Sequence, residues 1–209
     1  MNLKIAFVGL VSLFFVLPGW SQTADVKLGA TGVYGEIKEG LYTNSAFKFQ
    51  IQFPLDWIVL ENQEAKELIK AGIKVAELDE KELERKEKYR LSLLSMLKKP
   101  AGSVDNATAT LSAMKQPSSS VSPLAVANLS RKGLSESPAI RFDNDTRLIN
   151  LGEKQFATFD YTMTVGERSV KGKYLVTMSG NYSITLFLSN ENPADDKVLL
   201  TIVNSIRFY

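Results

Sequence analysis

The sequence predicts an α/β protein of the α+β type, built around an antiparallel β-sheet with separate helices. Apolar and polar residues alternate over 47–53 and again within 155–165, which is typical of strands that bury one face. Turn sequences of two to four residues separate the strand-like segments of the last third. Links this short join antiparallel strands, because a parallel crossover needs a dozen residues or more. Helical patterns occur elsewhere in the chain, so the sequence indicates both kinds of element.

The composition bounds the size and the chemistry of the protein. The chain has 209 residues, 44% hydrophobic and 23% charged, which corresponds to about one domain. It contains no cysteine and no histidine. Disulfides and thiolate metal sites are thereby excluded, and the commonest general base and metal ligand are missing. Its 25 basic and 23 acidic residues give a net charge of +2, so no basic surface for nucleic acid is expected.

The first residues have the pattern of a secretory signal peptide. Lys4 is the single charge before an apolar stretch at 5–17, and small residues follow. We predict a signal peptide at 1–21 that is cleaved after Ser21, with cleavage after Ala24 as the alternative. An uncleaved membrane anchor is the other interpretation, but the apolar stretch is shorter than the ~20 residues that span a bilayer.

Export and the lack of cysteine together indicate a bacterial location. An exported chain without cysteine does not depend on oxidative folding, and it offers no cysteine for a lipoprotein anchor. We therefore expect a periplasmic or secreted protein with no stable membrane span after signal cleavage.

The mature chain is predicted to hold one domain after an irregular segment. Residues 22–46 are rich in Gly and Thr and are predicted to be an irregular lead-in, so the domain is placed at 47–209. The alternation over 47–53 predicts a strand that Pro54 ends. We predict that 57–60 is its partner strand in a hairpin.

The middle of the chain is predicted to contain both helices and strands. Residues 62–90 are rich in Glu and Lys with spaced apolar residues, which predicts one or two amphipathic helices with a solvated face. Strands are predicted at 90–97 and 107–115, followed by a loop. Ser122 and Pro123 have the residue types of a helix N-cap and first position, and they precede a short predicted helix at 124–134.

The last third is predicted to be an antiparallel meander closed by a helix. The turn sequences at 165–168 and 179–181 separate consecutive strands. Asn192 and Pro193 then open a helix predicted to reach residue 204, and a short strand or tail follows at 206–208. The predicted strands of the meander are 147–151, 155–165, 170–178 and 182–188.

Two stretches of the chain resemble a known superfamily. The first contains Tyr42, Asn44, Phe47, Phe49, Ile51, Phe53, Pro54 and Trp57, and the second contains Tyr182, Ile184, Leu186, Asp195, Ser205 and Ile206. Both are similar to the superfamily of PsbP, the photosystem II extrinsic protein, and Mog1, the Ran-binding protein, which includes exported bacterial members of unknown role. The resemblance covers 42–60 and 155–208, and it implies a central antiparallel sheet flanked by helices, an α/β/α sandwich.

The residues that carry this resemblance are structural in type. Phe47, Phe49, Phe53 and Trp57 are expected in the core, so the resemblance implies a fold and not a site. The two named proteins bind other proteins, but nothing in this sequence matches a photosystem or Ran partner surface.

Catalytic motifs are missing from the sequence. There is no P-loop, no dinucleotide-binding glycine pattern and no G-x-S-x-G nucleophile turn. A pair of carboxylates could still act as acid and base, although turn and helix-cap positions explain the same acids. The candidates are Asp143, Asp145, Asp160, Glu167, Asp195 and Asp196.

Residue types alone allow two further arrangements. Residues 143–145 could open a calcium loop, but the sixth position has no Gly and the twelfth no Glu. Ser130 or Ser169 could act with a lysine, but Ser169-x-Lys171 lacks the Ser-x-x-Lys spacing. We therefore predict no catalytic, cofactor-binding or metal-binding residue.

The sequence as a whole predicts an exported, non-enzymatic binding or assembly module with a protein partner. The sheet face or the 62–90 segment is the expected contact surface. Two alternatives stay open: a carboxylate-dependent hydrolase, and a carrier of a small ligand or lipid with a pocket between sheet and helix.

Overall fold

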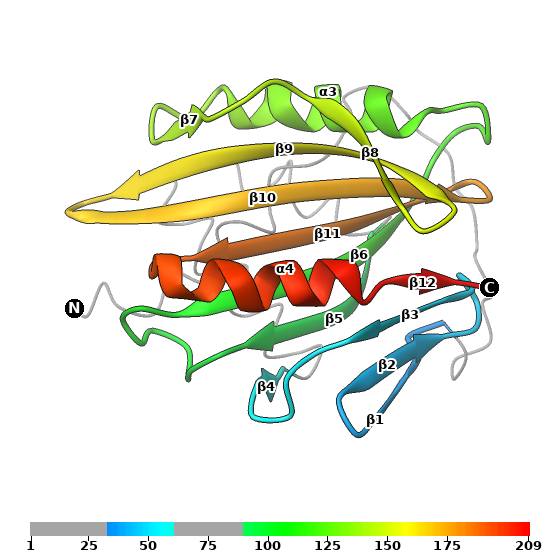
Figure 1. The fold of residues 1–209 in the computed structure, drawn as a ribbon. Helices are drawn as coiled ribbons and strands as arrows, with labels where there is room; N and C mark the ends of the chain where they lie inside the picture. Colours follow the sequence, from blue (N-terminus) through cyan, green and yellow to red (C-terminus); the bar gives the residue numbers. More distant parts are fainter. Residues whose placement is uncertain (1–32, 61–89) are drawn as a thin grey trace.

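The computed structural model describes residues 33–60 and 90–209, which form two antiparallel sheets and two α-helices (Figure 1). The predicted signal peptide at 1–21 and nearly all of the predicted helical segment at 62–90 lie outside the described residues. The α+β fold class with antiparallel strands, predicted from the sequence, is confirmed. The smaller sheet has the order β1-β2-β3-β12, with strands Glu36–Lys38, Leu41–Asn44, Phe49–Gln52 and Arg207–Phe208.

The larger sheet contains the predicted meander. Its order is β4-β5-β6-β11-β10-β9-β7, and β8 also pairs with β9. Every pairing is antiparallel, and the turns at Gly166 and Gly180 lie where the sequence predicts them. The strands are β4 Ile58–Val59, β5 Arg90–Leu97, β6 Ala107–Lys115, β7 Ile140–Phe142, β8 Arg147–Leu151, β9 Lys154–Val165, β10 Arg168–Ser179 and β11 Tyr182–Asn190.

Both described helices begin at the predicted caps. Helix α3 spans Pro123–Leu134, and the Ser122 hydroxyl accepts a hydrogen bond from the backbone N–H of Ala125 at 3.2 Å. The second helical segment opens with a 3₁₀ turn, η2 (Pro193–Asp195), which continues as α4 (Asp196–Asn204). Neither described helix is long and apolar enough to span a membrane.

The core is divided into two hydrophobic clusters by the alternation of the strands. On β10, Leu175 belongs to the first cluster, whereas Tyr174 and Val176 belong to the second. The first cluster joins the larger sheet to α4 and to β3 of the smaller sheet, and the second joins it to α3, which packs against β9 and β10 (Figure 1). Successive side chains of a strand point to opposite faces, so a single strand contributes to both clusters.

The predicted hairpin between 47–53 and 57–60 is wrong. Strand β3 pairs with β2 and β12, while β4 pairs with β5, Ile58 lying opposite Leu97. The chain turns at Pro54, whose carbonyl accepts from the N–H of Trp57 at 3.2 Å, and Trp57 is buried in the first cluster. Burial of this indole between the sheets turns the expected hairpin into a crossover from one sheet to the other.

The predicted irregular lead-in at 22–46 is also corrected where the structure describes it. Residues 36–44 form the β1–β2 hairpin around Glu39 and Gly40, both with positive φ (50° and 73°). Positive φ at both central positions defines a type I′ turn. A Cβ on Gly40 would lie 2.7 Å from the carbonyl oxygen of Phe53, so the turn packs directly against the end of β3 and belongs to the same domain.

Candidate functional site

The six acids proposed as catalytic candidates fall into separate regions of the structure. Glu167 is exposed in the β9–β10 turn. Asp143, Asp145 and Asp160 lie around β7 and β9, where the backbone N–H of Asp143 donates to the carbonyl of Asp160 at 2.9 Å. Asp195 and Asp196 instead lie at the start of α4.

Asp160 is held as an ionised carboxylate. Its oxygens accept hydrogen bonds from Lys173, Asn144 and Arg147, the last at 3.0 Å. Burial by itself raises the pKa of a carboxyl group, but these donors together lower the pKa of Asp160 below its usual value. A group of this kind stabilises its donors and has no proton to deliver at neutral pH.

The segment at 143–145, considered as a calcium loop, is tied to arginines. Arg131 donates to the Asn144 carbonyl at 2.7 Å and pairs with Asp145 at 3.3 Å, while Arg141 pairs with Asp143 at 3.0 Å. Among the described residues, no three acidic side chains cluster as metal ligands would. The segment is therefore a turn anchored to α3 and β7.

The two serines considered with lysine have other surroundings. Ser130 is buried, and its hydroxyl lies 3.0 Å from the hydroxyl of Tyr174. Burial raises the pKa of Tyr174 to about 12, although hydrogen bonds partly oppose this shift. Ser169 is exposed on β10, and the ammonium of Lys171 pairs with Asp196 at 3.8 Å.

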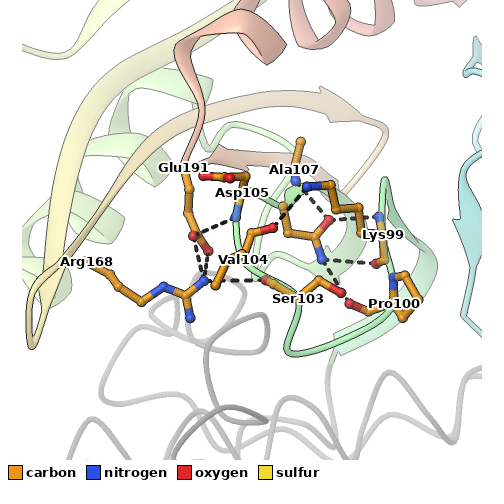
Figure 2. A network of polar contacts seen from close by, with 9 residues as sticks. Lys99, Pro100, Ser103, Val104, Asp105, Ala107, Arg168 and Glu191 are labelled. Carbon is orange, nitrogen blue, oxygen red and sulfur yellow. Dashed lines mark hydrogen bonds and ion pairs between the residues drawn. The ribbon is translucent and has the colours of Figure 1, made fainter.

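A different polar network connects three loops at one end of the larger sheet (Figure 2). Its centre is Asn106, whose side chain is buried between β5 and β6. The Asn106 Oδ1 atom accepts from the backbone N–H groups of Lys99 and Ala107, both at 2.9 Å. Its Nδ2 atom donates to the carbonyls of Lys99 and Pro100 at 3.0 and 3.3 Å. This one amide therefore fixes the conformation of the β5–β6 loop.

A charged pair joins this loop to two other strand ends. Arg168, the first residue of β10, donates to both carboxylate oxygens of Glu191 at 2.6 Å. Glu191 also accepts from the N–H of Asp105 at 3.1 Å, and Arg168 reaches the carbonyl of Ser103 at 3.4 Å (Figure 2). Only 10% of the Glu191 side chain is exposed. Charge-assisted hydrogen bonds that are shielded from solvent are stronger than ion pairs on the exposed surface.

A second ion pair, between a partly exposed lysine and a buried aspartate, lies at the same end. Lys98, directly after β5, places its ammonium 2.5 Å from Oδ1 of Asp195, whose side chain is 4% exposed. The other oxygen of Asp195 is buried without a hydrogen-bond partner. We call the surface formed by residues 98–106, Arg168 and residues 190–196 the loop rim.

The loop rim presents an apolar tip on a rigid base. Val104 is 60% exposed at the tip of the β5–β6 loop. The ammonium of Lys99 donates to the Val104 carbonyl at 3.1 Å, and Asp105 adopts a positive φ of 53°. Strained backbone of this kind persists only where the surroundings determine it. The loop rim therefore combines a loop that is held in one conformation with two ion pairs. Such a surface can meet another molecule without first having to become ordered.

Comparisons with known proteins give distant structural neighbours. No family model and no curated protein matches the chain. Similar solved structures include cyanobacterial PsbP (CyanoP) from Synechocystis sp. PCC 6803, with a TM-score of 0.49, 15% identity and coverage of 81% of this chain and 91% of that one. LpqN of Mycobacterium tuberculosis, described as involved in cell envelope biogenesis, has a TM-score of 0.45 and 15% identity over 76% and 81% of the two chains.

A third neighbour comes from Bacteroides thetaiotaomicron. It has a TM-score of 0.45 and 12% identity over 81% of this chain, which spans about half (48%) of that protein's length. A PsbP protein, from the superfamily that the sequence resembles, is thus among the solved structures similar to this chain.

Proposed function

We propose that this protein is an exported, non-enzymatic binding or assembly module that contacts a protein partner through the loop rim. The observation that carries the proposal is the buried network of Asn106, Arg168 and Glu191, which holds an exposed loop in one conformation. Binding sites are often found on loops that a rigid scaffold positions.

The physical properties of the loop rim fit a binding surface. A loop that is already ordered loses little conformational entropy when a partner binds. Val104 supplies an exposed apolar tip, and the loop rim also carries the charged groups of Lys98, Arg168 and Asp196. Protein interfaces usually combine apolar and charged groups in this way.

The state of the carboxylates supports binding over hydrolysis. A retaining or inverting hydrolase needs one carboxyl group with a raised pKa as its general acid. The pKa of Asp160 is lowered instead. The hydrolase therefore stands as the alternative that a turnover measurement must address.

The proposal also includes the arrangement of the helices around the sheet and the export of the protein. The α/β/α sandwich implied by the resemblance is supported by the placement of α3 and α4 in different hydrophobic clusters. Export is supported by the pattern of residues 1–21, and N-terminal sequencing of the mature protein from its host would place the cleavage after Ser21 or Ala24.

The test is crosslinking and affinity capture of the mature chain, residues 22–209, from the envelope extract of its host. We expect Val104→Asp to abolish capture of the partner, because a charge at the apolar tip must be desolvated on binding. Leu148→Asp is the matched control, since Leu148 is an exposed apolar residue (44%) on β8, away from the rim. Capture that both variants retain equally, or turnover lost on substituting one carboxylate, would contradict the proposal.

A further inference from the structure

Strand β1 forms an outer edge of the smaller sheet. The order of this sheet places β1 next to β2 and leaves its other side without a neighbour among the described residues (Figure 1). All three of its residues, Glu36, Ile37 and Lys38, are exposed. An unpaired edge of this kind offers backbone N–H and C=O groups to another strand.

The register of the hairpin shows which backbone groups are offered. Lys38 pairs with Leu41 across the two-residue turn, and Ile37 pairs with Tyr42. In a two-residue hairpin the closing pair exchanges hydrogen bonds, and bonded and non-bonded pairs then alternate. The N–H and C=O of Ile37 therefore point away from β2, toward the open edge.

The charges of β1 are complementary to themselves in one arrangement. When two copies of β1 run antiparallel with Ile37 opposite Ile37, each Glu36 faces the Lys38 of the other copy. In this register the backbone N–H of each Ile37 donates to the backbone C=O of the other Ile37, so the two residues form a hydrogen-bonded pair. A parallel arrangement would instead set like charges side by side, which destabilises a strand pair.

We propose that a second copy of this chain docks on β1, antiparallel and centred on Ile37, so that the smaller sheets of two copies form one continuous sheet. The contact uses the same residues on both copies and is therefore a closed two-fold interface. It also covers exposed apolar surface on Ile37 (45% exposed). A three-residue strand buries little area, so the dimer is expected to be weak and dependent on concentration.

The charges provide the test. Sedimentation velocity and light scattering on residues 22–209, over a series reaching about 1 mM, the weak end of measurable affinity, should show a monomer–dimer equilibrium. Glu36→Lys and Lys38→Glu should each be monomeric, because like charges then face each other across the contact. A 1:1 mixture of these two variants should form a heterodimer, since each lysine again faces a glutamate.

Two further variants separate this contact from other effects. The double variant Glu36→Lys, Lys38→Glu keeps the charges complementary and should dimerise like the native chain. Val104→Asp changes the loop rim and should also leave the dimer intact, so that the dimer and the proposed partner are tested independently. A native chain that stays monomeric throughout, or a dimer that both single charge variants retain, would overturn the proposal.

Discussion

Single buried asparagines fix the loops of this protein at both ends of the molecule. The Asn106 side chain hydrogen-bonds the backbone of the β5–β6 loop. The Asn44 side chain does the same for the segment that leads into β3. Asn44 donates to the carbonyl of Val33 at 2.8 Å and accepts from the N–H of Phe47 at 3.0 Å. A buried amide is stable only when its donors and acceptor are paired, so each asparagine specifies one loop conformation.

Gly172 lies where the core leaves no room for a side chain. It lies opposite Tyr161 on the neighbouring strand, and a Cβ at this position would lie 2.1 Å from the Cζ atom of that fully buried ring. Gly172→Ala should therefore lower the free energy of unfolding by about 3 kcal/mol, the upper end for overpacking a core. Urea unfolding of the variant and the native protein measures the difference.

Substitutions of Tyr161, which lies opposite Gly172, supply the control. Tyr161→Ala removes the ring, so Gly172→Ala should cost much less in that background, giving a clear coupling energy between the two sites. Tyr161→Phe keeps the ring and should leave the full cost of Gly172→Ala in place. Its own effect should be small or stabilising, because the Tyr161 hydroxyl is buried without a hydrogen-bond partner. Equal costs in all three backgrounds would rule out this contact.

At the scale of one element, the N-terminus of α3 depends on the Ser122 cap. The Ser122 hydroxyl accepts the otherwise unpaired N–H of Ala125. We expect Ser122→Ala to lower the free energy of unfolding by about 1 kcal/mol, the usual value of a lost cap. Ser120→Ala is the matched control, since Ser120 is exposed in the preceding loop and its hydroxyl contacts that of Ser118. Thermal unfolding of both variants should separate them, and equal losses would contradict a cap.

The elements that could be predicted are those whose signals lie within a few residues. The meander, the cap of α3 and the last helix follow from local alternation, turn sequences and Ser or Asn before Pro. The pairing of β3 could not be predicted, because its partner β12 is more than 150 residues away and the turn at Pro54 resembles that of a hairpin. The β1–β2 hairpin was missed because Glu39 is an uncommon residue for a type I′ turn.

The candidate site was less visible in the sequence than the fold. Residues 100–102 signal a break between strands but nothing about binding. Arg168 and Glu191 are 23 positions apart in the sequence, and Lys98 and Asp195 are 97 positions apart. No short spacing pattern in the sequence therefore reveals either ion pair. Residue type alone singles out acids such as Asp160, whereas its donors Lys173, Asn144 and Arg147, which lower its pKa, come from distant positions that only the structure brings together.

At the scale of the whole molecule, the two ends of the described chain close the smaller sheet together. Strand β12 pairs with β3, and the Ser205 hydroxyl both accepts from the N–H of Gln52 at 2.9 Å and donates to its carbonyl at 3.1 Å. Helix α4 and β3 meet in the first hydrophobic cluster. Strands β2 and β3 near the start and α4 near the end of the described chain therefore share one core cluster with the larger sheet.

Buried tyrosines give this domain a predictable response to alkali. Burial raises the pKa of Tyr42 and of Tyr174 from 10.0 to about 12 each, and it raises the pKa of Tyr161 as well. Between pH 10 and 12 the unfolded chain loses these phenolic protons while the folded chain keeps them. The unfolded state then binds fewer protons, so the free energy of unfolding falls as the pH rises.

We expect full stability from these groups below pH 10 and a loss of about 2 to 3 kcal/mol per tyrosine as the pH approaches 12. Urea unfolding at a series of pH values from 8 to 11.5 measures this slope. Tyr174→Phe provides the decisive comparison, because it removes one titrating group from the core. It loses the contact with Ser130 and should be less stable at pH 8, yet its stability should fall less steeply above pH 10. A slope equal to that of the native protein would show that Tyr174 ionises as easily in the folded chain as in the unfolded one.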